Sequence, residues 1–380
     1  MPRDEIFEAT GLQVWQINTL FQLYSMVRTG SAELEAARTL LPLPNLFYYW
    51  LGAPPCAEYT EASSTQCLDL RTRAWSTDLI GRFGIRTELF PSLVEPGTQI
   101  GVLRTELASD AGLSGATRVV AVGSHDTASA VGAIPGLDEK SVFISSGTWS
   151  VLGMEMSRPV INSRVLATGF GNEGGLAGKT LLLKNLTGLW LLQECRRLWK
   201  RDGHYRTWQE LLALADTVEP FRSLIDPEAP DFLSPDDMPA AIRAFCLRTG
   251  QPAPEGVGAL VRCCLESLAL RYRVTLHELE ELAGTRVTAL RIVGGGSQNR
   301  MLCQLAAEAC GVPVIAGPTE ATALGNVMAQ AIGAGDLAGI AEGRTAVGNS
   351  VAMDTYEPRQ SEGWTDAVER SLAWTRTAAG

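Results

Sequence analysis

Residues 287–317 read VTALRIVGGGSQNRMLCQLAAEACGVPVIAG and decide the class of fold. The run 287–293 is apolar and β-branched, as expected for a buried strand, and three glycines, 294–296, follow it. The next segment has helical spacing and ends at Gly311, after which come a second strand and a helix over 320–334. This order of strand, glycine turn, helix, strand and helix is typical of an α/β protein with a mostly parallel sheet. Ligands of such proteins usually bind at the turns that follow the strands.

Segments ahead of this unit extend the pattern. Residues 118–123, RVVAVG, predict a buried strand that ends in a glycine turn, and a helix of small residues follows. Residues 141–156, SVFISSGTWSVLGMEM, predict a β-hairpin around a Ser-Gly-Thr turn. Residues 257–283 predict the most regular helix, because apolar residues recur three or four apart until Gly284 ends it. The polar, proline-rich stretch 219–239 predicts a surface loop.

The length of the chain predicts more than one domain. At roughly 150 residues per domain, 380 residues suffice for about two. The segment 135–140 is rich in turn-forming and charged residues and separates the strand–helix unit from the hairpin. We therefore predict a boundary there, with one domain over 1–137 and another over 138–380.

The composition excludes several classes of protein. Hydrophobic residues make up 46% of the chain and charged residues 19%, which excludes a disordered protein. No apolar run approaches the roughly 18 residues that a membrane-spanning helix needs, so no membrane partner is expected. The net charge of −10 argues against nucleic-acid binding, which depends on clustered lysine and arginine. Backbone N–H groups can still bind a small molecule that carries phosphate.

The first residues of the chain, and its histidines and cysteines, lead to two further expectations. The first ten residues, MPRDEIFEAT, have neither a basic nor an apolar region, so no secretory signal is visible and a cytoplasmic protein with reduced thiols is expected. The three histidines, His125, His204 and His277, lie far apart and no cysteines form a CxxC pair, so no metal site of these residues is expected. The oligomeric state stays open, as does a pairing of Cys246 with Cys263.

Three features are candidates for chemistry. The triplet 294–296 lets the backbone approach a flat ligand or a phosphate, but it also suits a plain strand–helix turn. The turn 145–148, Ser-Ser-Gly-Thr, clusters hydroxyl and N–H groups that suit a phosphate chain, but it also suits a plain hairpin. Asp126 follows a buried strand and is either a general base for a substrate hydroxyl or the N-cap of the next helix. Together the three form a layout for phosphoryl transfer.

The order of these segments resembles the FGGY family of carbohydrate kinases. GSHDTASAVGAIP, FISSGTWSVLG, GGGSQNRMLCQLAAEACGVPV and EATALGN follow one another as in that family, and the similarity extends along essentially the whole chain. The resemblance implies an α/β fold of the actin-like ATPase (ribonuclease H-like) type. It also implies a sugar-binding N-terminal domain over 1–137 and a nucleotide-binding C-terminal domain over 138–380.

Within the family, five segments are most similar to the rhamnulokinase sub-family. They are QINTLFQL at 16–23, YWLGAPPCAEYTEASSTQ at 49–66, the Ser-His-Asp-Thr segment 124–127, GNEGG at 171–175 and LLKNLTGLWLLQECRRLW at 182–199. This similarity implies an enzyme that transfers a phosphoryl group from ATP to L-rhamnulose, giving L-rhamnulose 1-phosphate in rhamnose catabolism. It also implies Mg²⁺ on the ATP phosphates.

The resemblance further implies the roles of individual residues. Asp126 would take the proton from the terminal hydroxyl of the sugar, and His125 and Thr127 would contact the sugar beside it. The residues implied for the ATP site are Thr148, facing the phosphates, Gly295, against the nucleoside, and Asn185 and Gln193. Because Asp126 precedes the predicted boundary and Thr148 follows it, we expect a site at a hinge that excludes water when it closes.

The start of the sequence departs from the family pattern. The family opens with a strand–turn–strand that carries an Asp-x-Gly-x-[ST] phosphate motif, whose Asp helps to hold Mg²⁺. Here the only Asp-x-Gly is Asp110-Ala111-Gly112, which predicts a surface turn. We therefore expect an incomplete N-terminal domain with an exposed sheet edge and an apolar patch, and hence poor solubility or a partner over that gap. Two alternatives stay open beside a rhamnulose kinase: a kinase for another ketose or polyol, and a non-catalytic nucleotide-binding protein.

Overall fold

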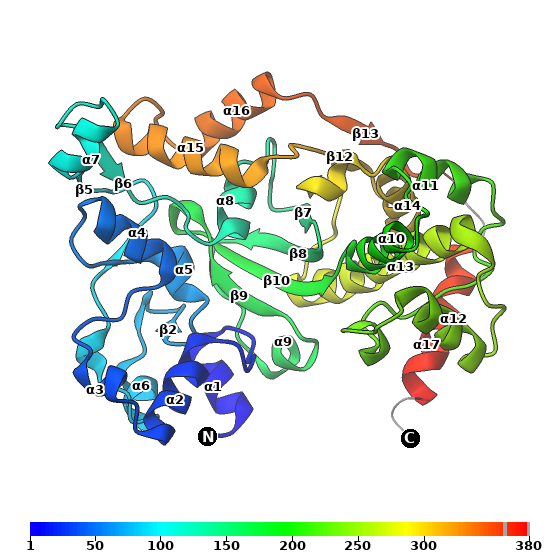
Figure 1. Cartoon of the computed structure of the whole chain (residues 1–380), viewed down its shortest axis with the longest axis horizontal. Coiled ribbons are helices and arrows are strands. Elements are labelled where there is room, and N and C mark those ends of the chain that lie inside the picture. The colour runs from blue at the N-terminus through cyan, green and yellow to red at the C-terminus, as the bar shows by residue number, and fades with distance from the viewer. Residues whose placement is uncertain (360–362, 378–380) are drawn as a thin grey trace. The chain divides into compact units, whose positions relative to one another are not determined.

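The computed structural model describes residues 1–359 and 363–377, with side chains as far as Ser371 (Figure 1). Its contacts divide the chain into two compact units. The first unit comprises Met1–Glu139, Gly153–Lys184 and Glu320–Ala352, and the second comprises Lys140–Leu152, Asn185–Thr319 and Met353–Gly380. The first break falls beside the predicted boundary, and two later segments return to the first unit. The assignment of sugar binding to 1–137 and of nucleotide binding to 138–380 stays a prediction.

The first unit is mostly helical, with three small two-stranded sheets. Its helices are α1 (Arg3–Thr10), α2 (Thr19–Thr29), α3 (Ala32–Ala36), α4 (Leu43–Leu51), α5 (Tyr59–Ser63), α6 (Thr77–Arg82), η1 (Thr87–Leu89), α7 (Thr105–Asp110), α8 (Asp126–Gly132), α9 (Ser163–Ala167), η2 (Leu176–Gly178), α15 (Ala321–Ala334) and α16 (Ile340–Ser350). Its strands are β1 (Ala57–Glu58), β2 (Leu68–Asp69), β3 (Ala74–Trp75), β4 (Leu93–Val94), β5 (Gln99–Val102), β6 (Arg118–Val120) and β9 (Gly171–Gly174).

The second unit carries the α/β alternation. Its strands are β7 (Ser141–Ser146), β11 (Ala289–Val293), β12 (Val314–Ala316) and β13 (Asp354–Tyr356). Its helices are α10 (Trp190–Arg201), α11 (Trp208–Asp216), η3 (Pro230–Phe232), α12 (Met238–Arg248), α13 (Gly256–Ala283), η4 (Gly295–Gln298), α14 (Arg300–Cys310) and α17 (Trp364–Thr377). Two long strands, β8 (Trp149–Met156) and β10 (Thr180–Thr187), have residues in both units.

One seven-stranded sheet has the order β13-β12-β11-β7-β8-β10-β9. β11 lies inside the sheet and pairs in parallel with both β7 and β12, while β13 pairs antiparallel with β12. The expected strand, glycine turn, helix, strand and helix are β11, η4, α14, β12 and α15, so this prediction is confirmed. The expected hairpin is confirmed as well, because β7 and β8 are neighbours joined by two residues.

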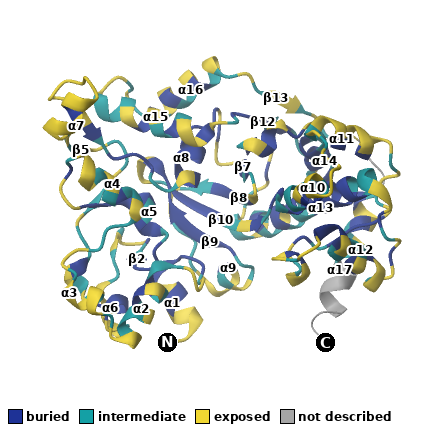
Figure 2. Ribbon diagram, in the orientation of Figure 1, coloured by how far each residue is buried: buried dark blue, intermediate teal, exposed yellow. Residues whose placement is uncertain are grey.

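The long helix α13 forms the core of the second unit. It packs against α11 and α14, and its apolar residues at helical spacing are buried, as the dark ribbon in Figure 2 shows. It ends as predicted at Gly284, which takes a left-handed conformation and donates its N–H to the Glu280 carbonyl. A hydrogen bond of 2.7 Å between the Tyr272 hydroxyl and Ser150 ties the helix to β8.

The expectation of a surface loop over 219–239 is wrong for its middle part. Leu224 and Ile225 are almost fully buried, although they lie in no helix or strand. Buried side chains supply the hydrogen-bond acceptors that a helix or strand would otherwise provide. The Leu224 N–H donates to Gln251 Oε1 (3.0 Å) and the Ile225 N–H to Ser267 Oγ (2.9 Å). Because its backbone groups are satisfied in this way, an irregular segment can enter the core.

The structure also describes the Asp-x-Gly segment, the cysteines and the length of the helices. Asp110 ends α7 and is followed by exposed residues with Gly112 in a left-handed conformation, so the Asp-x-Gly there is a surface turn. All eight cysteines are free thiols, Cys246 and Cys263 included. In the part of the chain that the structure describes, no helix combines the length and apolar composition needed to cross a membrane.

An apolar face is exposed on α4. Leu43, Phe47 and Trp50 lie one turn apart, and all three keep more than half of their surface accessible. The rings of Phe47 and Trp50 pack edge to face, with centroids 5.4 Å apart. The predicted poor solubility stays a prediction.

Candidate active site

Asp126 begins α8 in the first unit. The chain leaves β6, turns through residues 121–125 and enters the helix, whose buried side packs against α15. The N-cap is His125, so Asp126 is not the cap but the first helical residue. Its Oδ1 accepts a hydrogen bond of 2.6 Å from the Thr127 N–H, and 80% of its side chain is exposed. The carboxylate is therefore held in place by its own helix while it faces outward, as a base for an external substrate must.

A buried carboxylate from another segment fixes the turn that leads to Asp126. Glu58 is fully buried, and its oxygens accept four hydrogen bonds. The donors are the Thr60 N–H (2.8 Å) and hydroxyl (2.6 Å), the Glu61 N–H (3.1 Å) and the Ser124 N–H (3.0 Å). The Thr60 hydroxyl also accepts the His125 N–H at 3.2 Å. Glu58 and Thr60 thus hold the backbone of two consecutive residues beside Asp126.

Burial and hydrogen bonding act in opposite directions on Glu58. Burial raises the pKa of Glu58, and the four donated hydrogen bonds oppose that rise because they favour the charged carboxylate. Burial likewise raises the pKa of Glu61, where neighbouring His125 opposes the rise and Asp126 and Glu173 add to it. The segment around Asp126 is therefore lined by carboxyl groups.

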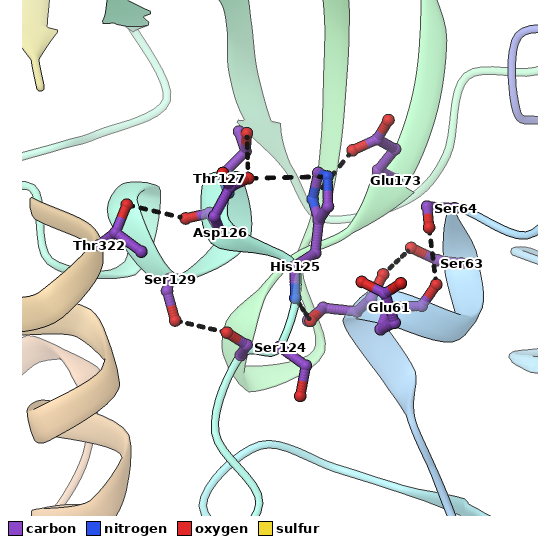
Figure 3. A network of polar contacts seen from close by, with 12 residues as sticks. Glu61, Ser63, Ser64, Ser124, His125, Asp126, Thr127, Ser129, Glu173 and Thr322 are labelled. Atoms are coloured by element: carbon purple, nitrogen blue, oxygen red, sulfur yellow. Dashed lines mark hydrogen bonds and ion pairs between the residues drawn. The ribbon is translucent and has the colours of Figure 1, made fainter. Parts of the chain in front are cut away.

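His125 lies between two of these carboxylates (Figure 3). Its Nδ1 is 3.3 Å from Glu173 Oε2, and its Nε2 is 4.0 Å from Asp126 Oδ1. Burial lowers the pKa of His125, but Glu173, Asp126, Glu61 and Glu58 together outweigh it, so the pKa is raised. Thr127, the third predicted sugar contact, is almost fully buried and donates from its hydroxyl to Asp126 Oδ1 at 3.4 Å.

In the second unit, the β7–β8 hairpin contacts the two segments that carry the predicted ATP-site residues Gln193 and Gly295. Thr148 lies exposed in the β7–β8 turn, and its carbonyl accepts the Trp190 N–H (3.1 Å) at the start of α10, the helix that carries Gln193. The glycine triplet packs on β7, because a Cβ on Gly296 would lie only 2.5 Å from the Ser146 Cβ. Asn185 lies exposed on β10.

Gly295 differs from its neighbours in the triplet. It is exposed, and a Cβ built on it would meet no atom within 4 Å. The space above it is open to a ligand, while Gly296 is needed for packing. In this strand–helix turn, Gly296 therefore faces packed atoms and Gly295 faces open space.

This contrast predicts different effects for two adjacent substitutions. Gly296→Ala should lower the free energy of unfolding by roughly 1 to 3 kcal/mol, because the added methyl overpacks against Ser146. Gly295→Ala is the matched control and should leave the stability nearly unchanged. Denaturant unfolding of the two variants measures this, and equal stabilities would contradict the packing argument.

Sequence reasoning missed Glu58, Thr60 and Glu173. Glu173 lies in the GNEGG segment, and Glu58 and Thr60 lie in YWLGAPPCAEYTEASSTQ, so these segments were the available signal, but their individual residues carried no periodic pattern. Glu58 precedes the segment that it fixes by more than sixty residues. Only the folded chain brings these carboxylates to the turn before Asp126.

The comparisons with known proteins agree with this arrangement. The family model for the N-terminal domain of the FGGY family of carbohydrate kinases matches residues 1–132, and that for its C-terminal domain matches residues 142–334. The chain belongs to the FGGY family of carbohydrate kinases. The predicted membership is confirmed.

Curated FGGY relatives include several rhamnulokinases. The protein of that name from Bacteroides thetaiotaomicron is 44% identical over 362 residues, which cover 95% of this chain and 74% of the relative. The one from Enterococcus faecalis is 40% identical, and the match covers 93% of this chain and 71% of the relative. The predicted similarity to this sub-family is therefore confirmed.

Solved structures show the fold. A xylulose kinase from Brucella ovis has a TM-score of 0.79 at 22% identity, covering 99% of this chain and 76% of that one. A xylulose kinase from Rhodospirillum rubrum has a TM-score of 0.78 at 18% identity, covering 100% of this chain and 75% of that one. These FGGY neighbours confirm the predicted α/β fold of the actin-like ATPase type.

Proposed function

We propose that this FGGY kinase phosphorylates L-rhamnulose with ATP to give L-rhamnulose 1-phosphate, in rhamnose catabolism. The observation that carries the proposal is the 44% identity to a rhamnulokinase across 95% of the chain. An exposed carboxylate, Asp126, held at a helix start by a buried hydrogen-bond network, supports it. The free cysteines suit a reducing compartment, and we propose a cytoplasmic location.

We assign the acceptor chemistry to the first unit. Asp126 takes the proton of the sugar's terminal hydroxyl while the hydroxyl oxygen bonds to the γ-phosphorus of ATP. The bond between that phosphorus and the oxygen that stays with ADP breaks. His125 and Thr127 contact the sugar beside it. The protein's main contribution is to position these groups, because phosphoryl transfer needs little covalent work from the enzyme.

We assign ATP binding to the second unit. The Thr148 turn faces the phosphates, Gly295 lies against the nucleoside, and Asn185 and Gln193 complete the site. The open space above Gly295 supports this assignment, because a nucleoside can approach the backbone there. That Asp126 and Thr148 face one common site stays a prediction.

The family implies Mg²⁺ on the ATP phosphates. Among the described residues, no group of three or more His, Cys, Asp or Glu side chains is placed to hold a metal ion. We propose that Mg²⁺ is needed as the partner of the ATP phosphates, and we assign none of this chain's residues to it.

Direct detection of the product tests the function. The purified 380-residue chain is incubated with Mg·ATP and L-rhamnulose, and sugar phosphate is measured against a panel of other ketoses and polyols. We expect L-rhamnulose 1-phosphate as the main product. A larger kcat/KM for another sugar would show that this other sugar is the substrate. Nucleotide binding by folded protein without any product would show that the chain is a non-catalytic nucleotide-binding protein.

Thr148→Ala tests the phosphate turn. We expect the KM for ATP to rise several-fold while the KM for the sugar stays within about twofold, because one hydroxyl hydrogen bond to a charged phosphate is lost. Steady-state kinetics with each substrate varied in turn measures both constants. A larger effect on the sugar than on ATP would contradict the assignment.

A further inference from the structure

We propose that Glu173 is a positioning residue that faces Nδ1–H of His125 and favours the charged ring, in which Nε2 also carries hydrogen and offers it to a sugar oxygen beside Asp126. The part that concerns the sugar rests on the proposed function. The part that concerns the imidazole proton does not, and the two are tested separately.

The first support is the isolation of the His125–Glu173 pair. His125 Nδ1 and Glu173 Oε2 are 3.3 Å apart, and both atoms are buried. Neither atom forms a hydrogen bond among the described residues, so this ion-pair approach is the polar contact that the structure gives them. An unpaired buried nitrogen or oxygen is costly, so each atom depends on the other. A carboxylate oxygen only accepts hydrogen bonds, so its approach to Nδ1 is favourable when Nδ1 carries the proton.

The second support is the charge around the ring. Four carboxyl groups act on His125 from several elements: Glu173 from β9, Glu61 from α5, Glu58 from β1 and Asp126 from the helix that His125 caps. Burial disfavours a charged imidazole, but these four groups outweigh burial. Glu173 makes the largest contribution of the four and is the nearest carboxylate, at 3.3 Å against 4.0 Å for Asp126.

The third support is the construction of β9, which leaves Glu173 free for this contact. Asn172 binds the Val160 N–H (2.7 Å) and the Gly11 carbonyl (2.9 Å), and the Gly174 N–H donates to Ser63 Oγ (2.7 Å). A Cβ on Gly174 would lie 2.6 Å from the Tyr59 ring, so glycine is required for β9 to approach α5. The neighbours of Glu173 thus secure the strand, while its own carboxylate reaches the ring of His125.

A pH dependence follows from the fixed Nδ1 proton. Below the pKa of His125 both ring nitrogens carry hydrogen, and Nε2 can donate to a sugar oxygen. Above that pKa, Glu173 retains the Nδ1 proton, so the proton leaves from Nε2 and the donor becomes an acceptor. The KM for the sugar should therefore rise as the pH rises through the pKa of His125.

Nuclear magnetic resonance of the imidazoles tests the first part without any sugar. The chain has only three histidines, and His204 and His277 are exposed, so the ring of His125 is readily assigned. In the wild-type chain, the ¹⁵N shifts above the pKa should show the neutral ring protonated at Nδ1. A neutral ring protonated at Nε2 would overturn the proposal, and this measurement needs no variant.

Glu173→Gln then removes the charge but keeps the shape. We expect a lower pKa of His125 than in the wild type, and a smaller decrease in the matched control Glu61→Gln, whose carboxyl has no direct contact with the ring. Glu173→Asp keeps the charge and should restore part of the decrease. An equal or larger decrease in Glu61→Gln would overturn the assignment to Glu173.

Kinetics test the second part. At a pH between the pKa values of His125 in the two proteins, Glu173→Gln should raise the KM for the sugar about tenfold, with a smaller change in kcat. The pH at which KM rises should move with the pKa of His125. If that pKa decreases while the KM profile stays in place, His125 does not donate to the sugar and the positioning role is wrong. If no sugar is phosphorylated by the wild type, the proposed function fails, while the result for the imidazole stands.

Discussion

Asp126→Asn is expected to lower turnover by about two to four orders of magnitude, the usual contribution of a general base. The carboxamide oxygen can still accept the Thr127 N–H that Asp126 Oδ1 accepts at 2.6 Å, so the helix start should be preserved. The side chain is 80% exposed, and the substitution should therefore leave the free energy of unfolding nearly unchanged. A loss of kcat without a loss of stability is the expected signature.

Coupled ADP release and thermal unfolding of the same preparation measure both quantities. Asp110→Asn is the matched control, because it makes the same chemical change at the exposed end of α7, outside the proposed site. We expect wild-type turnover from that variant. Wild-type turnover from Asp126→Asn as well would show that Asp126 only stabilises the first turn of α8.

Glu58→Ala should have the second largest effect, on stability and turnover together. It removes the acceptor of four hydrogen bonds in the interior and leaves the backbone N–H groups of Thr60, Glu61 and Ser124 without it. Unsatisfied buried donors of this kind should lower the free energy of unfolding by roughly 2 to 4 kcal/mol. Turnover should also fall, because Ser124 and His125 position the segment that contains Asp126.

Glu58→Gln separates shape from charge at the same position. Its carboxamide oxygen keeps one acceptor, but its NH₂ group faces donors, so we expect a stability between those of the wild type and the alanine variant. Denaturant unfolding together with kcat at a temperature where both variants are folded measures the effects. A fully stable Glu58→Ala with normal kcat would show that the buried carboxylate has no positioning role.

Glu58 and Glu173 also show where prediction from sequence ends. Residues near Asp126 were recognised because they share one short segment, 124–127, whose order is typical of a family. The two carboxylates that position this segment come from β1 and β9, one before it in the chain and one after it. No local rule of periodicity, capping or turn formation relates residues so far apart, and their contact exists only after the chain has folded.

The irregular segment 219–239 illustrates the same limit for the fold. Its prolines and polar residues predict a surface loop, but Leu224 and Ile225 are buried because Gln251 and Ser267 satisfy their backbone N–H groups. Composition describes the preference of the segment itself, whereas burial depends on partners supplied from elsewhere in the chain.

By itself, the sequence determined the class of fold, the hairpin, the ends of α13 and α14, and the segment that holds Asp126. These features depend on interactions within a few residues: apolar spacing, glycine in a left-handed conformation after a helix, and turn-forming residues between strands. Only the tertiary structure decided which glycine of the triplet packs and which is open, that Glu58 holds the turn before Asp126, and that Glu173 pairs with His125. These features depend on close packing and on low-dielectric contacts between distant segments, which form only when the whole chain has folded.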